Sequence, residues 1–99
     1  MTRSVRVLRR AQRDLQEIYD YLVLEAPLRA GLFIDKLLSV IESLSTMPER
    51  GAAPRDPILR ARGYRFLIHD PYLIFFKVIG RQVRVYRVLR GSRAYRDLL

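Results

Sequence analysis

The chain has 99 residues, 49% of them apolar, and its 19 basic and 10 acidic side chains give a net charge of +9. This length predicts one small domain over residues 1–99, and the apolar and aromatic content excludes a disordered chain. The lack of cysteine and the single histidine, His69, exclude disulfides, thiolate zinc sites and imidazole-rich metal centres. We therefore expect no metal and no other cofactor.

Residues 5–8 predict a short strand, because Val5 and Val7 alternate with Arg6. From about residue 9 the apolar period becomes helical, and this first helix is expected to end before Pro27. The acidic residues of this helix are expected on its solvated side. The apolar stripe is formed by Ala11, Leu15, Ile18, Tyr19 and Leu22, and the acidic side by Asp14, Glu17 and Asp20.

A second helical stripe follows and ends at residues 46–48, again at a proline. The short connection between the two stripes predicts an antiparallel helical hairpin. Residues 48–57 carry three prolines and a glycine and are expected to be a linker between a helical half and a β half. The second stripe consists of Ala30, Phe33, Ile34, Leu37, Leu38, Ile41 and Leu44.

The β half predicts three antiparallel strands over residues 64–69, 72–79 and 82–89, with turns at residues 69–71 and 80–81. The middle run is apolar on both sides, which is typical of a central strand. In the last strand, strict alternation places Val83, Val85, Arg87 and Leu89 on one face, and Arg84, Tyr86, Val88 and Arg90 on the other. The fold class is thus α+β: an N-terminal strand, a two-helix hairpin, and a three-stranded antiparallel meander packed on the hairpin.

The positive charge is concentrated in this β half. Residues 1–49 hold seven basic and seven acidic side chains, whereas residues 50–99 hold twelve basic and three acidic ones. Such a half attracts nucleic acid, an acidic protein or an anionic membrane surface. The basic residues 1–10 are not followed by an apolar segment of signal-peptide length, and no run is long enough to cross a membrane. We expect a cytoplasmic protein with no membrane contact.

The residues that could carry function are the arginines and tyrosines of the β half. His69 and Asp70 are neighbours whose side chains diverge in a strand, and Gly-x-Ser-x-Gly and glycine-rich phosphate loops are absent. The arginines and tyrosines could clamp phosphates and stack on bases, bind carboxylates of an acidic protein, or form a solvated basic face. They are Arg65, Arg84, Arg87, Arg90, Arg93 and Arg96, with Tyr64, Tyr72, Tyr86 and Tyr95.

An ordered set of motifs over nearly the whole chain resembles the RelE/ParE superfamily, the toxins of type II toxin–antitoxin modules. Residues 11–21 (AQRDLQEIYDY) resemble the first-helix signature of that superfamily. The later motifs are Leu44 with Met47-Pro48 and Gly51, Gly63-Tyr64-Arg65, residues 72–76 (YLIFF) and residues 85–93 (VYRVLRGSR). The resemblance implies the fold predicted above and a cytoplasmic bacterial growth inhibitor, of the kind tied to plasmid stabilisation. It also implies an acidic cognate antitoxin that holds the toxin inactive in a hetero-oligomer.

The resemblance implies two alternative activities. ParE-like members bind DNA gyrase, whereas RelE-like members cut mRNA on the ribosome with arginines, lysines and a tyrosine. Leu73 stands where the nucleases carry an arginine, and the remaining nuclease set would be Arg65, Arg90 and Tyr95, with Arg93 as a substitute for Arg90. The long hairpin and residues 88–93 (VLRGSR) look more like ParE. A gyrase inhibitor without catalytic residues is therefore favoured over the endoribonuclease, and a non-toxic antitoxin-binding module is a third reading.

The predicted contact residues for the antitoxin or the target come from the same basic set. They are Arg65, Arg84, Arg87, Arg90, Arg93, Arg96 and Tyr86. Arg87 has an alternative interpretation, because the predicted strand places it among apolar neighbours. It would then be buried against a carboxylate of the helices, such as Glu17 or Glu42.

Overall fold

The computed structural model describes residues 2–91 and 95–99 and confirms the α+β fold. A strand is followed by two long helices, two short helical segments and three further strands. In chain order the elements are β1 (Ser4–Val7), α1 (Arg9–Glu25), α2 (Pro27–Ser43), the 3₁₀ turn η1 (Pro48–Arg50), α3 (Pro57–Ala61), β2 (Arg65–His69), β3 (Tyr72–Ile79), β4 (Gln82–Arg90) and the 3₁₀ turn η2 (Tyr95–Asp97).

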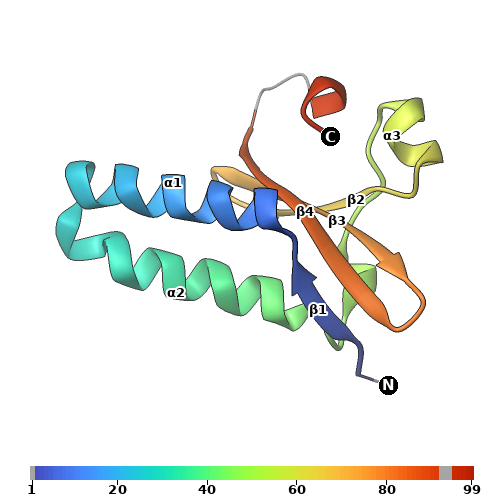
Figure 1. Ribbon diagram of the computed structural model, residues 1–99, viewed down its shortest axis with the longest axis horizontal. Helices are drawn as coiled ribbons and strands as arrows, with labels where there is room; N and C mark the ends of the chain where they lie inside the picture. The colour runs from blue at the N-terminus through green and yellow to red at the C-terminus, as the bar shows by residue number, and fades with distance from the viewer. Residues whose placement is uncertain (1, 92–94) are drawn as a thin grey trace.

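The helices α1 and α2 form the predicted antiparallel hairpin (Figure 1). The break between them is set by Pro27. The residue before a proline disfavours helix, so α1 ends at Glu25, and proline fits the first position of α2, where no backbone N–H donor is needed. The amide of Ala26 still donates to the carbonyl of Leu22 at 2.7 Å, which closes the last turn of α1.

The sheet has the strand order β1-β4-β3-β2. The strands β2, β3 and β4 form the predicted antiparallel meander, and Gly80 adopts the positive φ of 59° that the two-residue turn between β3 and β4 uses. The strand β1 joins the far side of β4 in parallel orientation, which the sequence pattern did not specify. A parallel pair needs a long connection, and here it runs through the helical hairpin, α3, β2 and β3.

One face of the sheet packs against the hairpin and forms the core. Tyr72, Ile74 and Phe76 of β3 and Val83, Val85 and Val88 of β4 meet the apolar faces of both helices. Gly51 lies against the ring of Phe76. A Cβ at position 51 would lie 2.7 Å from the Cε1 atom of that ring, so this close contact leaves no room for a side chain. The α1–α2 hairpin thus buries one side of the sheet.

Residues 48–57 are more than the expected linker. After η1, Ala52 exchanges hydrogen bonds of 2.8 and 2.9 Å with Phe66, so the segment adds a bridge to the edge of β2. Asp56 then caps α3, accepting from the amides of Ile58 at 2.8 Å and Leu59 at 3.4 Å. The short helix α3 was not predicted, because five residues are too few to show a helical period.

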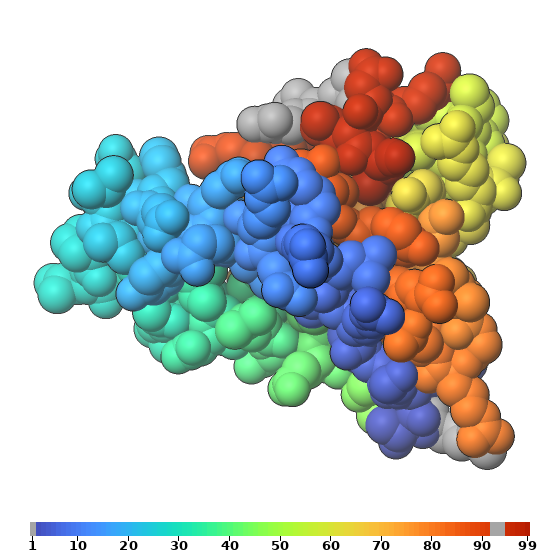
Figure 2. Space-filling view, viewed as in Figure 1, coloured from blue at the N-terminus to red at the C-terminus, as the bar shows by residue number. Residues whose placement is uncertain are grey.

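The opposite face of the sheet is the outer face, and the described residues cover one half of it. The helix α3 and the C-terminal segment lie on that side in Figure 1, and Leu59 and Tyr95 pack there with Phe66, Leu73 and Phe75. At the other half β1 and the turn of the β3–β4 hairpin lie side by side at the surface (Figure 2). In the part of the chain that the structure describes, no helix is long and apolar enough to span a bilayer.

Candidate functional site: the groove between α1 and β4

The free edge of β4 is the first feature of the site. β1 pairs only with residues 82–85 of β4, and the amide of Leu8 donates to the carbonyl of Val85 at 3.0 Å before the chain turns into α1. Beyond that point β4 continues to Arg90 with β3 on one side and, among the described residues, no strand on the other. An unpaired strand edge carries backbone groups that can pair with another chain.

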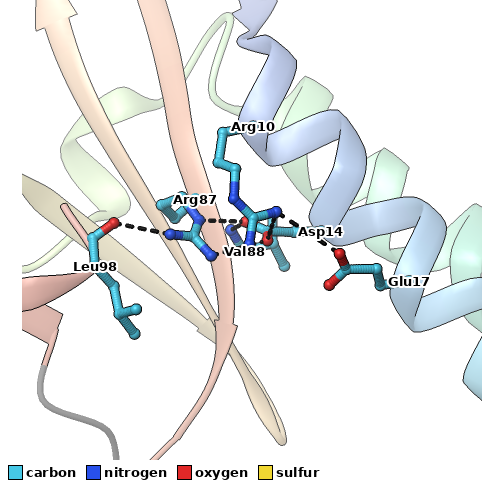
Figure 3. A network of polar contacts seen from close by, with 6 residues as sticks. All are labelled: Arg10, Asp14, Glu17, Arg87, Val88 and Leu98. Carbon is cyan, nitrogen blue, oxygen red and sulfur yellow. Dashed lines mark hydrogen bonds and ion pairs between the residues drawn. The ribbon is translucent and has the colours of Figure 1, made fainter.

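Asp14 of α1 lies against this edge and contacts the side chains of Arg10 and Arg87 (Figure 3). Only 4% of Asp14 is exposed. Its Oδ2 accepts from the Nε of Arg87 at 2.7 Å and from the backbone amide of Val88 at 3.0 Å, and its Oδ1 accepts from the Nη2 of Arg87 at 3.1 Å. Arg10 places its Nη1 2.9 Å from the same Oδ1. A buried carboxylate needs such partners, since an unpaired buried charge is very costly.

A bulge in β4 brings Arg87 to this carboxylate. Phe76 pairs with Val85 and Phe75 pairs with Arg87, so Tyr86 is an extra residue without a partner on β3. The inward positions are therefore Val83, Val85 and then Val88, and Arg87 leaves the apolar row. It lies between α1 and the C-terminal segment, where its Nη1 donates to the carbonyl of Leu98 at 2.8 Å.

These contacts correct two expectations from the sequence. Arg87 is bound to a helix carboxylate, as its alternative interpretation held, but the carboxylate is Asp14 and not Glu17 or Glu42. Asp14 is not solvated either. Its spacing to Ala11 and Ile18, three and four residues away, places it in the buried stripe of α1 and was the signal that could have revealed it.

Next to the cluster is a shallow groove of about 270 Å³ between α1 and the end of β4. Its walls combine charges and aromatic rings, with Glu17 and Tyr21 on the helix side and Tyr72 and Arg90 on the sheet side. Arg90 is exposed. The groove therefore places an exposed arginine beside the end of β4 that no described strand covers.

Comparison with known proteins identifies the chain. Residues 5–95 match the family described as ParE toxin of type II toxin-antitoxin system, parDE. The chain belongs to this family. No curated protein matches it.

Two solved structures resemble this ParE-family chain. One is described as a chromosomal ParDE toxin–antitoxin system from P. aeruginosa; it is 25% identical, the match covers 92% of this chain and 98% of that one, and the TM-score is 0.77. The other is the toxin–antitoxin complex RelBE2 from Mycobacterium tuberculosis, with 19% identity, 91% and 99% coverage and a TM-score of 0.60. At that identity the second likeness concerns the fold alone.

The three residues named for a nuclease are not brought together in the ParE-family chain. Arg65 pairs with Phe76 in the sheet, faces the hairpin side, and donates from Nη2 to the carbonyl of Gly51 at 3.0 Å. Tyr95 packs its ring on Phe75, with centroids 4.8 Å apart, on the outer face. Consecutive residues of a strand point to opposite faces, so the sheet separates Arg65 from Tyr95. The hydroxyl of Tyr95 lies 3.5 Å from the carbonyl oxygen of Arg90, not near Arg65.

Arg96 ties the C-terminal turn of the toxin to α3. Its Nε and Nη2 donate to the two carboxylate oxygens of Asp56 at 2.9 and 3.1 Å. The hydrogen bond from Arg96 lowers the pKa of Asp56, with further help from the amides of Ile58 and Leu59, although burial acts in the opposite direction. The same bond raises the pKa of Arg96. Arg96 therefore has a partner within the fold.

The remaining predicted contact residues divide between two surfaces. Arg84 lies on the uncovered half of the outer face, and Tyr86, the bulged residue, places its ring 5.3 Å from that of Tyr64. Arg90 lines the groove beside α1. Arg93 lies outside the described residues, and its role as a contact residue stays a prediction.

Proposed function

We propose that this ParE-family toxin inhibits DNA gyrase and is neutralised by an acidic antitoxin bound in the groove between α1 and β4. The observation that carries the antitoxin part is the end of the β4 edge after Val88, which no described strand covers and beside which Arg90 is exposed. The gyrase part is supported by membership of the ParE family, since ParE-like activity is gyrase binding.

The groove fits an acidic segment in an extended conformation. Strand addition to an exposed sheet edge supplies main-chain hydrogen bonds, and specificity comes from the side-chain sites beside the edge. The solved structure that is 25% identical to this chain is described as a ParDE toxin–antitoxin system, which supports a hetero-oligomer with an antitoxin. With a net charge of +9 the toxin attracts an acidic partner at long range.

The endoribonuclease alternative receives less support from the geometry. Its set of Arg65, Arg90 and Tyr95 is divided by the sheet. Leu73, at the position where the nucleases carry an arginine, lines an apolar cavity of about 260 Å³ with Phe75 and Tyr95. A leucine there has no charge with which to stabilise a developing phosphorane.

The hairpin offers a surface for a protein target. Leu24, Leu28 and Leu32 are 82%, 99% and 62% exposed around the turn between α1 and α2. Exposed apolar side chains grouped in this way are typical of protein interfaces. This surface lies outside the groove lining and is the one that we propose for contact with gyrase.

Supercoiling of relaxed plasmid by purified gyrase tests the proposal. We expect the purified toxin to inhibit supercoiling in a dose-dependent manner and the acidic protein encoded next to it to restore the activity. Normal supercoiling at a large excess of toxin would contradict gyrase inhibition. Codon-positioned mRNA cleavage in a translating extract, lost in Tyr95→Phe, would establish the nuclease instead.

The antitoxin part has its own measurement. Binding to the folded toxin alone raises its free energy of unfolding by about 2.7 kcal/mol when the free antitoxin is at a hundred times its Kd. Co-purification of the adjacent gene product, with a higher Tm of the complex, is the expected result. A toxin that purifies without that protein and shows no change in Tm when it is added would contradict neutralisation at this groove.

A further inference from the structure

Three cations lie next to one another across three strands of the sheet. Arg6 of β1 pairs with Arg84 of β4, and Arg84 pairs with Lys77 of β3. The strand neighbours of all three pack into the core against the hairpin. Because side chains alternate along a strand, the three cations point to the uncovered half of the outer face. We call Arg6, Arg84 and Lys77 the cationic row.

The charge of the cationic row is not neutralised within the described part of the fold. None of its three residues forms an ion pair with a described carboxylate. Arg84 donates from Nε to the neutral Oε1 of Gln82 at 2.6 Å, and the Nζ of Lys77 lies 4.3 Å from the ring centroid of Tyr64. Like charges directly opposite each other in a sheet are destabilising, so the row points to an anion supplied from outside.

Two tyrosines beside the row, Tyr64 and Tyr86, have their rings in contact with the Nζ of Lys77 and are not open to a base. The Nζ of Lys77 is also 5.0 Å from the centroid of Tyr86, and the two tyrosine rings meet edge to face at 78°. Tyr64 is only 6% exposed, and this burial raises the pKa of its hydroxyl. Stacking of bases on these rings is therefore disfavoured, and the row itself is the contact surface.

We propose that the cationic row binds the phosphodiester backbone of a nucleic acid. The row spans two strand spacings, about 10 Å. A DNA duplex carries one charge per roughly 1.7 Å of its axis, so a duplex offers several phosphates over the length of the row. Backbone contacts of this kind carry no sequence information. The proposal does not depend on gyrase as the target, although a toxin that acts on gyrase would meet the DNA that gyrase holds.

A protein ligand fits the cationic row less well. Arginine is common at protein interfaces, but these interfaces form around apolar and aromatic anchors. On the outer face the apolar half is already covered by α3 and the C-terminal turn, and the exposed leucines lie at the turn of the hairpin instead. The row therefore offers charge without an apolar anchor, which suits phosphate.

Fluorescence anisotropy with the purified full-length chain tests the proposal. The probes are a short labelled DNA duplex and a labelled single-stranded RNA, each titrated at several salt concentrations. For a duplex, each lost phosphate contact reduces the slope of log K against log salt by about 0.9, which corresponds to about eightfold weaker binding at 0.1 M salt. We expect this change for Arg6→Gln and for Arg84→Gln.

Exposed cations of the hairpin provide matched controls. Arg29→Gln and Lys36→Gln each remove one positive charge from α2, and both residues are exposed. We expect both controls to bind like the parent chain, and thermal melts verify that every variant is folded. Arg6 is exposed on a terminal strand, so its replacement leaves the core intact.

Three outcomes would overturn the proposal: no binding of either probe at low salt, equal losses in the row and control variants, or displacement of DNA by a polyglutamate peptide of equal charge at equal concentration. Tighter binding of the duplex would identify DNA as the source of the phosphates, and tighter binding of the RNA would identify RNA. A toxin that binds DNA through the row but leaves gyrase unaffected would contradict the proposed function alone.

Discussion

Arg84 and Arg87 are three residues apart in β4 and have opposite surroundings. Arg84 precedes the bulge at Tyr86, is half-buried, and has a neutral glutamine as its hydrogen-bond partner. Arg87 follows the bulge, is 9% exposed, and is held by both carboxylate oxygens of Asp14 and by the carbonyl of Leu98. Arg84 thus carries its charge outward, whereas the charge of Arg87 is neutralised within the fold.

This difference is produced by the length of β1. The strand stops at Val7, and the chain turns into α1, which places Asp14 beside the half of β4 that β1 does not reach. The carboxylate then takes the place of a strand, since it accepts from the amide of Val88. Residue type alone does not distinguish a binding arginine from a structural one; the presence of a carboxylate inside the fold does.

The largest expected effect is on the buried pair of Asp14 and Arg87. Asp14→Ala leaves Arg87 buried without its carboxylate, and we expect the free energy of unfolding to fall by about 3–5 kcal/mol in urea denaturation. Glu17→Gln is the control, because Glu17 is 68% exposed and lies 3.9 Å from Arg10; its expected change is below about 1 kcal/mol. Equal effects of the two substitutions would contradict the structural role of Asp14.

Arg90 lies three residues after Arg87 in β4 but is exposed in the groove, whereas Arg87 is buried. Arg90→Glu puts a negative charge where an acidic antitoxin is proposed to bind. We expect association to slow by about tenfold at low salt, since interface charges act mainly on the association rate. Stopped-flow measurement with the neighbouring gene product checks this. An equal slowing in Arg29→Glu, outside the groove, would contradict binding at this site.

A smaller effect with the opposite sign is expected in the cationic row. Arg6→Gln removes one of the like charges opposed across β1 and β4. We expect the free energy of unfolding to rise by about 0.2–1 kcal/mol at low salt, and the gain to shrink as salt screens the repulsion. Denaturation of Arg6→Gln and Arg29→Gln at two salt concentrations measures this. A loss of stability in Arg6→Gln would show that the row is not repulsive.

The smallest effect concerns the exposed pair between Arg96 and Asp56. Because the pKa of Asp56 is lowered in the folded chain, its contribution to stability is present above the unfolded pKa, about 4, and is lost as the pH falls through the folded pKa. We expect the parent chain to melt above Arg96→Gln at neutral pH and the gap to close in acid. A gap in Tm that is independent of pH would contradict the contribution of the pair.

The long elements of the fold could be predicted from the sequence because their signals are local. The helical period of α1 and α2, the proline between them and the glycine turn before β4 each act within a few residues. The parallel pairing of β1 with β4 joins residues nearly 80 positions apart, for which a single sequence holds no local signal.

The candidate site was only partly predictable for a related reason. The alternation in β4 placed Arg87 in line with Val83 and Val85, whereas the bulge at Tyr86 shifts it out of that row. The bulge depends on pairing with β3 and has no glycine to mark it. Asp14 did carry a signal in its helical spacing to Ala11 and Ile18, but an aspartate in an apolar stripe resembles a solvated residue until its partner is known.

The contrast between Arg84 and Arg87 of β4 is tested most directly by one pair of substitutions. Arg84→Gln and Arg87→Gln make the same chemical change three residues apart, and urea denaturation of both variants compares them. We predict that Arg87→Gln lowers the free energy of unfolding by about 3–5 kcal/mol, because the buried Asp14 carboxylate loses its ion-pair partner. Arg84→Gln is predicted to change the free energy of unfolding by less than about 1 kcal/mol. Similar losses in the two variants would contradict the contrast between Arg84, which carries its charge outward, and Arg87, whose charge is neutralised within the fold.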